Sequence, residues 1–186
     1  MHRNKLLNLL KVYEREYSEE SATVHRFEEF VRNHERCFER DCWAGHVTGS
    51  AWLVNRSMSH VLLTHHKKLN KWLQLGGHSD GDCDPLAVAL REAQEESGLK
   101  VVPVKLDVFD MDIHEIPARK TDPAHFHFDL RFALRTKTRD EFRVSDESDA
   151  LVWVPVADLS SYTREPSMLR MAEKWLRFQT GTVPGR

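Results

Sequence analysis

The stretch Arg91-Glu92-Ala93-Gln94-Glu95-Glu96-Ser97-Gly98-Leu99 holds three glutamates at helical spacing directly before a glycine. At about 100° per residue, Glu92, Glu95 and Glu96 fall within one sector of a helix. The opposite sector carries Leu86, Leu90, Ala93 and Ser97, which predicts an amphipathic helix with a wet acidic face. Because like charges at this spacing destabilise an isolated helix, either a divalent cation compensates them or the face is simply solvated. Oxygen ligands alone favour Mg²⁺ or Mn²⁺ over Zn²⁺.

Both ends of this helix are marked in the sequence. Asp84 precedes Pro85, a pair that is typical of an N-cap followed by proline in the first turn. Gly98 can adopt the left-handed conformation that ends a helix, and residues 99–102, which are apolar except for Lys100, then predict a strand. Upstream, residues 72–77 predict a short extended segment that ends in two glycines. The predicted unit is therefore strand, glycine-rich loop, helix and strand.

This unit resembles the signature box of the Nudix hydrolase family, G-x5-E-x7-R-E-U-x-E-E-x-G-U, in which U is an apolar residue. The alignment begins at Gly77, and the matching residues are Arg91, Glu92, Ala93, Glu95, Glu96, Gly98 and Leu99. One position departs from the pattern, because the first glutamate of the box falls on Cys83. Asp80, Asp82 and Asp84 surround this position, so a neighbouring carboxylate could take its place.

The resemblance implies a fold, an activity and a set of site residues. The implied fold is α/β, a Nudix-type α/β/α sandwich with a mixed β-sheet. The implied activity is divalent-metal-dependent hydrolysis of a pyrophosphate linkage in a nucleoside diphosphate linked to another moiety. The expected metal is Mg²⁺ (or Mn²⁺), held by Glu92, Glu95, Glu96 and the carbonyl of Gly76, with Arg91 orienting the glutamates. The general base is left open between a box glutamate and a later acidic residue, Asp146 or Glu147.

A second polar constellation lies on the predicted strand that contains His125-Phe126-His127-Phe128-Asp129-Leu130-Arg131. Alternation places His125, His127, Asp129 and Arg131 on one face of that strand. Residues 110–114 add further acidic groups and a histidine. Such a row is suited to bind a substrate phosphate or a further metal ion, although a hydrogen-bonded strand face is an equal alternative. The candidate substrate-binding residues are Gly77, His78, His125, His127, Asp129 and Arg131.

Two other functions compete with hydrolysis. Isopentenyl-diphosphate isomerase shares the Nudix fold and has a Cys-Gly-His loop where this chain has Gly76-Gly77-His78, so the cysteine of that chemistry is absent here. A non-catalytic nucleotide-binding Nudix domain is the other alternative, and only Cys83 favours it. The substrate class stays undetermined, because family resemblance does not transfer substrate specificity.

The composition limits the partners and the cellular location. The formal net charge of −2 arises from 27 basic and 29 acidic residues that are interspersed in the chain, which argues against binding to a nucleic acid duplex. Cys37, Cys42 and Cys83 form no zinc-ligand pattern and are expected to be reduced thiols. We recognise no secretion signal and no membrane span. A cytoplasmic enzyme with a small-molecule nucleotide or diphosphate substrate is therefore expected.

The chain is expected to divide into a helical N-terminal arm, residues 1–43, and a Nudix domain, residues 44–186. Apolar residues recur at helical spacing in the arm: Leu6, Leu10, Tyr13, Tyr17, Val24, Phe27, Val31 and Phe38. Either the arm packs on the domain or it forms the contact of a homodimer. Strands are predicted near 46–55, 60–65, 101–112, 125–135 and 150–155, and a last amphipathic helix from Pro166 to Phe178.

Overall fold

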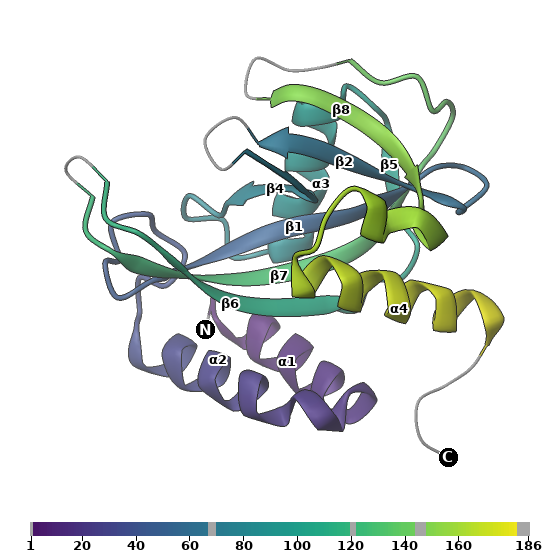
Figure 1. Ribbon diagram of the computed structural model, residues 1–186. Coiled ribbons are helices and arrows are strands. Elements are labelled where there is room, and N and C mark those ends of the chain that lie inside the picture. Colours follow the sequence, from purple (N-terminus) through teal and green to yellow (C-terminus); the bar gives the residue numbers. More distant parts are fainter. Residues whose placement is uncertain (1, 67–69, 120–121, 144–147, 182–186) are drawn as a thin grey trace.

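Two long strands, β1 (His46–Val54) and β7 (His125–Thr136), run parallel through the middle of a mixed sheet (Figure 1). The computed structural model describes residues 2–66, 70–119, 122–143 and 148–181. The other strands are β2 (His60–His66), β3 (Lys71–Leu73), β4 (Leu75–His78), β5 (Val101–Pro103), β6 (Asp110–Ile116) and β8 (Ser148–Pro155). The main order is β3-β2-β1-β7-β5, while β4 pairs with β1, β6 with β7 and β8 with β2. Antiparallel pairs surrounding one parallel pair make this an α/β fold with a mixed sheet, as expected.

Alternation along residues 46–51 of β1 and 125–131 of β7 separates an apolar face from a polar one. Phe128 and Leu130 of β7 join Val47 and Ala51 of β1 in one buried hydrophobic cluster. The residues between them point to the other face of the sheet, because successive side chains of a strand alternate. The parallel register sets His46 opposite His127 and continues the polar row along both strands. The predicted alternation is therefore confirmed.

Helices cover both faces of the sheet. Helix α3 (Pro85–Ser97) packs against β1 and β4 and buries Val88, Ala89 and Ala93. It begins at Pro85 and ends before Gly98, whose φ is +68°, so the predicted bounds are confirmed. Helix α4 (Pro166–Thr180) follows a 3-10 turn, η2 (Val156–Ser161), and buries Met168, Met171 and Trp175 over the opposite face. Among the described residues, no helix has both the length and the apolar character needed to cross a bilayer.

The N-terminal segment is helical, as predicted. It consists of α1 (Asn4–Glu16), a short turn η1 (Ser18–Glu20) and α2 (Ser21–Asn33), which lie beneath β6 and β7 in Figure 1. The ring of Phe30 stacks on Phe128 of β7, with centroids 3.8 Å apart and planes inclined by 6°. The arm therefore contributes to the same core as α3 in this chain. A homodimer contact through the arm stays a prediction.

The predicted strand 101–112 is wrong in one respect, because it is two strands. Both β5 and β6 pair antiparallel with β7, but Pro103 lies opposite Leu134 whereas Asp110 lies opposite Arg131. The chain between them bulges away from the ladder, with only the backbone N–H groups of Val104 and Phe109 donating to β7. Proline has no N–H to donate, which favours a break at this point. The resulting register places three polar side chains of β6 beside the polar row of β7.

Candidate functional site

The glutamates of the Nudix-like box differ in burial. Glu95 is exposed and Glu92 is half-buried, but Glu96 is only 9% exposed. The backbone N–H of Gly76 donates to Glu96 Oε1 over 2.8 Å, because β4 passes directly over the helix at this point. The prediction of a uniformly wet acidic face is therefore wrong for Glu96. The contact instead holds one carboxylate of the cluster in a fixed position beside the glycine-rich strand.

Arg91 connects α3 to the end of β4. Its NH2 group donates to Glu92 Oε1 over 2.9 Å and to the His78 carbonyl over 2.8 Å. The hydrogen bond to Glu92 raises the pKa of Arg91. Gly77 lies against the same carboxylate, since a Cβ atom there would be 2.3 Å from Glu92 Oε2. A glycine at this position therefore lets the backbone approach the acidic face, and Arg91 orients Glu92 as the resemblance implies.

Cys83 occupies the position of the missing box glutamate, and its thiol contacts a backbone carbonyl two residues earlier. Cys83 Sγ donates to the Gly81 carbonyl at 3.5 Å, and burial raises the pKa of this thiol. Of the three surrounding aspartates, Asp82 is the one that approaches the box arginine, with Oδ2 4.0 Å from Arg91 Nη1. Asp80 pairs with Arg40, and Asp84 accepts from Lys5. Replacement of the box glutamate by a neighbouring carboxylate stays a prediction, with Asp82 best placed for it.

The acidic face offers oxygen donors, which is the donor set that Mg²⁺ and Mn²⁺ prefer. Glu92, Glu95 and Glu96 all project from α3, but their oxygens do not form a group in which all lie within 4.8 Å of one another. Rotation of the exposed Glu95 side chain is the simplest way to bring the donors together around one ion. The donor chemistry of these residues therefore fits the implied metal, although the structure does not bring the three carboxylates to a single point.

A different group of side chains does converge. Within the described part of the chain, His46, His125 and His127 are the one set of potential metal ligands whose ligand atoms all lie within 4.8 Å of one another. The ring centroids of His46 and His127 are 4.7 Å apart, because these residues are register partners on β1 and β7. His78 lies next to them, with its ring centroid 5.1 Å from each of these two rings. The predicted histidines are thus brought together, and His46 is a member that was not predicted.

Burial keeps three of these imidazoles neutral, those of His46, His78 and His127. The pKa of His46 is lowered to about 4 and that of His127 to about 2. Desolvation is the largest cause for both residues, and the charge of neighbouring histidines is the second. The pKa of His78 is also lowered to about 4, mainly by desolvation and to a smaller extent by the positive charge of Arg40. At neutral pH each of these rings therefore carries one lone pair that is free to bind a cation or to accept a hydrogen bond.

Asp129 and Arg131, which were predicted to bind substrate, are instead buried among polar partners. Asp129 Oδ1 accepts from the hydroxyls of Thr48 and Ser50, both over 2.8 Å. Its Oδ2 accepts from Gln74 over 3.3 Å and from Arg131 Nε over 2.8 Å. Both side chains are nearly inaccessible, with Asp129 and Arg131 each 2% exposed. This geometry favours the alternative of a hydrogen-bonded strand face, and direct contact of these two residues with substrate stays a prediction.

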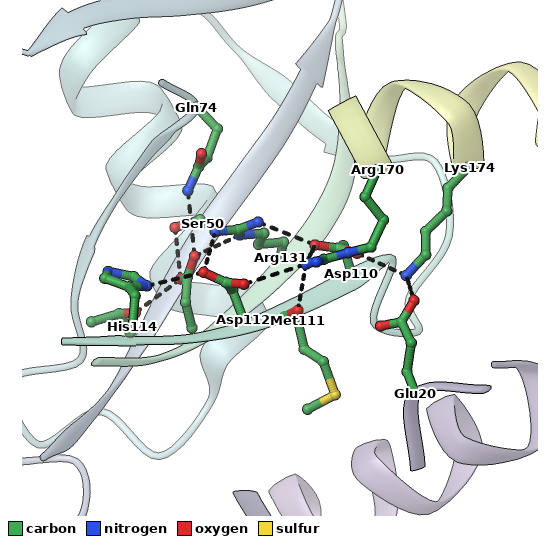
Figure 2. A network of polar contacts seen from close by, with 12 residues as sticks. Glu20, Ser50, Gln74, Asp110, Met111, Asp112, His114, Arg131, Arg170 and Lys174 are labelled. Carbon is green, nitrogen blue, oxygen red and sulfur yellow. Dashed lines mark hydrogen bonds and ion pairs between the residues drawn. The ribbon is translucent and has the colours of Figure 1, made fainter. Parts of the chain in front are cut away.

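The guanidinium of Arg131 extends into a larger ion network, shown in Figure 2. Arg131, Arg170 and Lys174 surround Asp110, at 3.1, 2.8 and 2.7 Å respectively. Although burial raises it, the hydrogen bond from Arg170 and the nearby positive charges hold the pKa of Asp110 below its ordinary value. Lys174 also pairs with Glu20 over 2.6 Å, which joins α4 to the N-terminal arm. The network is therefore a connector between the sheet, α4 and the arm.

Sequence reasoning missed this network. Arg170 and Lys174 are one turn apart on α4, beside an apolar stripe that includes the buried residues Met168, Met171 and Trp175. Two basic residues at this spacing next to such a stripe were the available signal. The candidate bases Asp146 and Glu147 lie outside the described residues.

Known proteins resemble the chain over most of its length. The model of the NUDIX domain matches residues 45–175. No curated protein sequence matches the chain. A solved hydrolase of the NUDIX family from Clostridium perfringens is 28% identical, with a TM-score of 0.52, and the alignment covers 72% of this chain and 97% of that one.

More distant structures share the fold. An Ap4A hydrolase from C. elegans, solved as a binary complex, is 16% identical with a TM-score of 0.59, covering 73% of this chain and 98% of that one. The Nudix hydrolase RenU from M. smegmatis is 19% identical with a TM-score of 0.53, covering 76% and 90%. The family match spans the sheet, the acidic helix and α4 described above. The chain belongs to the Nudix family and is a pyrophosphohydrolase that acts on acid anhydrides.

Proposed function

We propose that this protein hydrolyses a pyrophosphate linkage in a nucleoside diphosphate linked to another moiety, and that it requires Mg²⁺ or Mn²⁺. The observation that carries this proposal is the seating of β4 on the acidic face of α3. The Gly76 amide holds Glu96, the absence of a side chain at Gly77 makes room for Glu92, and Arg91 holds Glu92 from the other side. The chain thereby orients two of its three carboxylates before any ion binds.

Glu92, Glu95 and Glu96 would hold the ion, together with the carbonyl of Gly76. A divalent metal bound there would neutralise negative charge on the phosphate oxygens and would lower the pKa of a bound water. The residues of the chain supply the orientation, since Glu96 and Glu92 are held by the contacts described above and the exposed Glu95 is left to adjust. Preorganisation of this kind lowers the reorganisation that the reaction would otherwise require.

Gly77, His78, His125 and His127 are proposed to face the substrate, because they border the acidic face through the His78 carbonyl that accepts from Arg91. The substrate class is supported by the activities of two solved proteins with this fold. One is the C. elegans Ap4A hydrolase, and the other is the E. coli dihydroneopterin triphosphate pyrophosphohydrolase, with a TM-score of 0.50. Both substrates named there contain phosphoanhydride bonds. The general base is proposed to be a box glutamate, or Asp146 or Glu147.

Replacement of a box glutamate tests the proposal. Glu96→Gln keeps an amide oxygen that can accept from the Gly76 N–H, so we expect the fold to persist while the anionic ligand is lost. Turnover in the presence of Mg²⁺ should fall by about two to three orders of magnitude, the size typical for one group that stabilises transition-state charge. Glu95→Gln should have a similar effect. Glu29→Gln, an exposed glutamate on α2, is the matched control and should retain wild-type turnover.

The assay should cover nucleotide sugars, dinucleotides, nucleoside triphosphates and prenyl diphosphates, each with Mg²⁺ and with Mn²⁺. Hydrolysis of one class, lost in both glutamine variants, would support the proposal. An isomerised prenyl product without phosphate release would favour the isomerase alternative, against which the glycine at Gly76 argues. Nucleotide binding without turnover would favour a non-catalytic domain, for which Cys83 is the one departure from the box.

A further inference from the structure

We propose that His46, His125 and His127 bind a transition-metal ion of the Zn²⁺ class at a site separate from the acidic face of α3. The proposal goes beyond the hydrolase function, because it concerns other residues, other donor atoms and another ion. One nitrogen atom of each ring lies within 4.8 Å of the corresponding atoms of the other two. Nitrogen ligands around a tetrahedral Zn²⁺ ion are separated by about 3.3 Å, given Zn–N bonds of about 2.0–2.1 Å. Small side-chain rotations therefore suffice to close the group around an ion.

His46 gives the strongest evidence for a missing ligand. The residue is 2% exposed, and neither Nδ1 nor Nε2 makes a hydrogen bond of acceptable geometry within the described part of the chain. A buried polar atom without a partner is unfavourable, and such atoms in native proteins usually mark a bound water, an ion or a catalytic role. A cation between β1 and β7 would give one ring nitrogen of His46 the partner that it lacks.

His125 has the support that metal-binding histidines usually have. Its Nδ1 lies 2.8 Å from the Pro123 carbonyl oxygen. A carbonyl oxygen only accepts, so Nδ1 carries the proton and Nε2 retains its lone pair in the neutral ring. A hydrogen bond from the distal ring nitrogen to a backbone carbonyl fixes the tautomer and the orientation of a metal ligand. His125 is therefore held in the form that can coordinate through Nε2.

The donor set distinguishes this ion from the one on α3. Three imidazoles favour Zn²⁺ and its transition-metal neighbours, whereas Mg²⁺ prefers oxygen ligands and gives up its water reluctantly. Three protein ligands leave the fourth position of a tetrahedral ion for water or for an oxygen of a bound molecule. His78 lies beside the group, and its carbonyl accepts from Arg91. The two proposed metal sites are therefore connected through one residue, His78, whose ring lies beside the histidines and whose carbonyl is bonded to Arg91.

The first experiment uses the full-length protein, freed of metal with a chelator and then equilibrated with Zn²⁺ in an excess of Mg²⁺. Metal content measured by mass spectrometry should give one zinc ion per chain. Cobalt in place of zinc should produce the visible ligand-field bands of a low-coordinate nitrogen site. A wild-type protein that retains no zinc and gives no such bands would overturn the proposal.

Variants locate the ion. His127→Ala and His125→Ala should each weaken zinc binding at least tenfold, because each removes one of three ligands. His60→Ala is the matched control, since His60 lies on β2, contacts Ser59 and is outside the group, and it should bind zinc like the wild type. Glu96→Gln should also keep its zinc, so the result is independent of whether the protein hydrolyses pyrophosphates. Unchanged zinc affinity in both alanine variants, or loss of zinc in Glu96→Gln, would show that the ion binds elsewhere and refute the assignment.

Discussion

The polar face of β7 carries two regions that are alike in burial and opposite in bonding. At the start of the strand, His46 of β1 meets His125 and His127, and the nitrogens of His46 are without hydrogen bonds among the described residues. Two residues further along, both oxygens of Asp129 are bonded, and the guanidinium of Arg131 contacts three carboxylates. The polar side of β1 and β7 thus holds an ion network whose members are bonded to one another and a histidine group in which His46 lacks hydrogen-bond partners among the described residues.

The difference lies in which partners the side chains can offer one another. Carboxylates accept and guanidinium groups donate, so the ions around Asp110 satisfy one another without a ligand (Figure 2). A neutral imidazole has one lone pair and one N–H group, and burial disfavours a second proton on His46 and His127 by lowering the pKa of both. We call a polar cluster saturated when its members satisfy one another's hydrogen bonds, and unsaturated when some members lack partners. The saturated cluster is best interpreted as structural, and the unsaturated one as a binding site.

The largest effect on stability is expected from breaking the saturated region at its centre. Asp110 is fully buried and faces Arg131, Arg170 and Lys174. Asp110→Ala removes the anion and leaves positive charges buried without it, which should lower the free energy of unfolding by about 3–5 kcal/mol. Urea denaturation measures the change. If the variant fails to fold, Lys174→Met provides a second test, because it breaks the same network from α4.

An exposed pair supplies the control for this experiment. Arg36 Nη2 contacts Asp41 Oδ1 over 2.7 Å, and both side chains are more than half exposed, at 66% and 56%. Asp41→Ala should change the free energy of unfolding by less than about 1 kcal/mol, because solvent screens such pairs. A loss for Asp110→Ala as small as that of the control would contradict the interpretation of the network as structural.

How far the sequence predicts this comparison depends on the range of the interactions involved. The bounds of α3 follow from Pro85 at its start and Gly98 at its end, which act within one turn. The alternation along β7 is equally local, so the polar row was predicted correctly. Family resemblance added the sheet, the acidic helix and the activity, because the spacing of the box residues is specific.

Long-range register was beyond the same reasoning. Nothing near His46 in the sequence indicates that it lies opposite His127, which is about eighty residues away in the chain. The burial of Glu96 depends on the backbone of Gly76, and the saturation of Asp129 depends on Thr48 and Ser50 of another strand. A local pattern could therefore place the polar side chains on a face, but it could not tell the bonded ones from those that lack partners.

A smaller effect is expected from acidifying the saturated region. Although burial raises it, the hydrogen bond with His114 and the charge of Arg131 lower the pKa of Asp112 from 3.8 to about 2. A carboxyl group whose folded pKa is depressed stabilises the protein above its unfolded pKa, and the stabilisation is lost as the pH falls through the folded value. Asp112 should therefore contribute about 2 kcal/mol that disappears between pH 3.8 and about 2.

The difference between wild type and Asp112→Asn isolates this contribution from those of other carboxylates. Urea denaturation at a series of pH values should show the two stability curves converging as the pH falls from about 5 to about 2. Curves that stay parallel over this range would mean that the Asp112 carboxylate gains nothing from Arg131 and His114. The ionic character of this part of the network would then be incidental to the fold.

The smallest change in the free energy of unfolding is expected in the unsaturated region around His46, and there we expect a gain instead of a loss. His46→Leu replaces an imidazole whose two nitrogens lack a hydrogen-bond partner among the described residues by an apolar side chain of similar size. In metal-free protein no bond is lost and the desolvation cost of two ring nitrogens disappears, so the free energy of unfolding should stay equal or rise by about 1 kcal/mol. Thermal unfolding with and without Zn²⁺ measures this, and added zinc should raise the midpoint of the wild type but not that of the variant. A loss above about 2 kcal/mol without metal would show that His46 has a stabilising partner after all, and the contrast between the two regions of β7 would disappear.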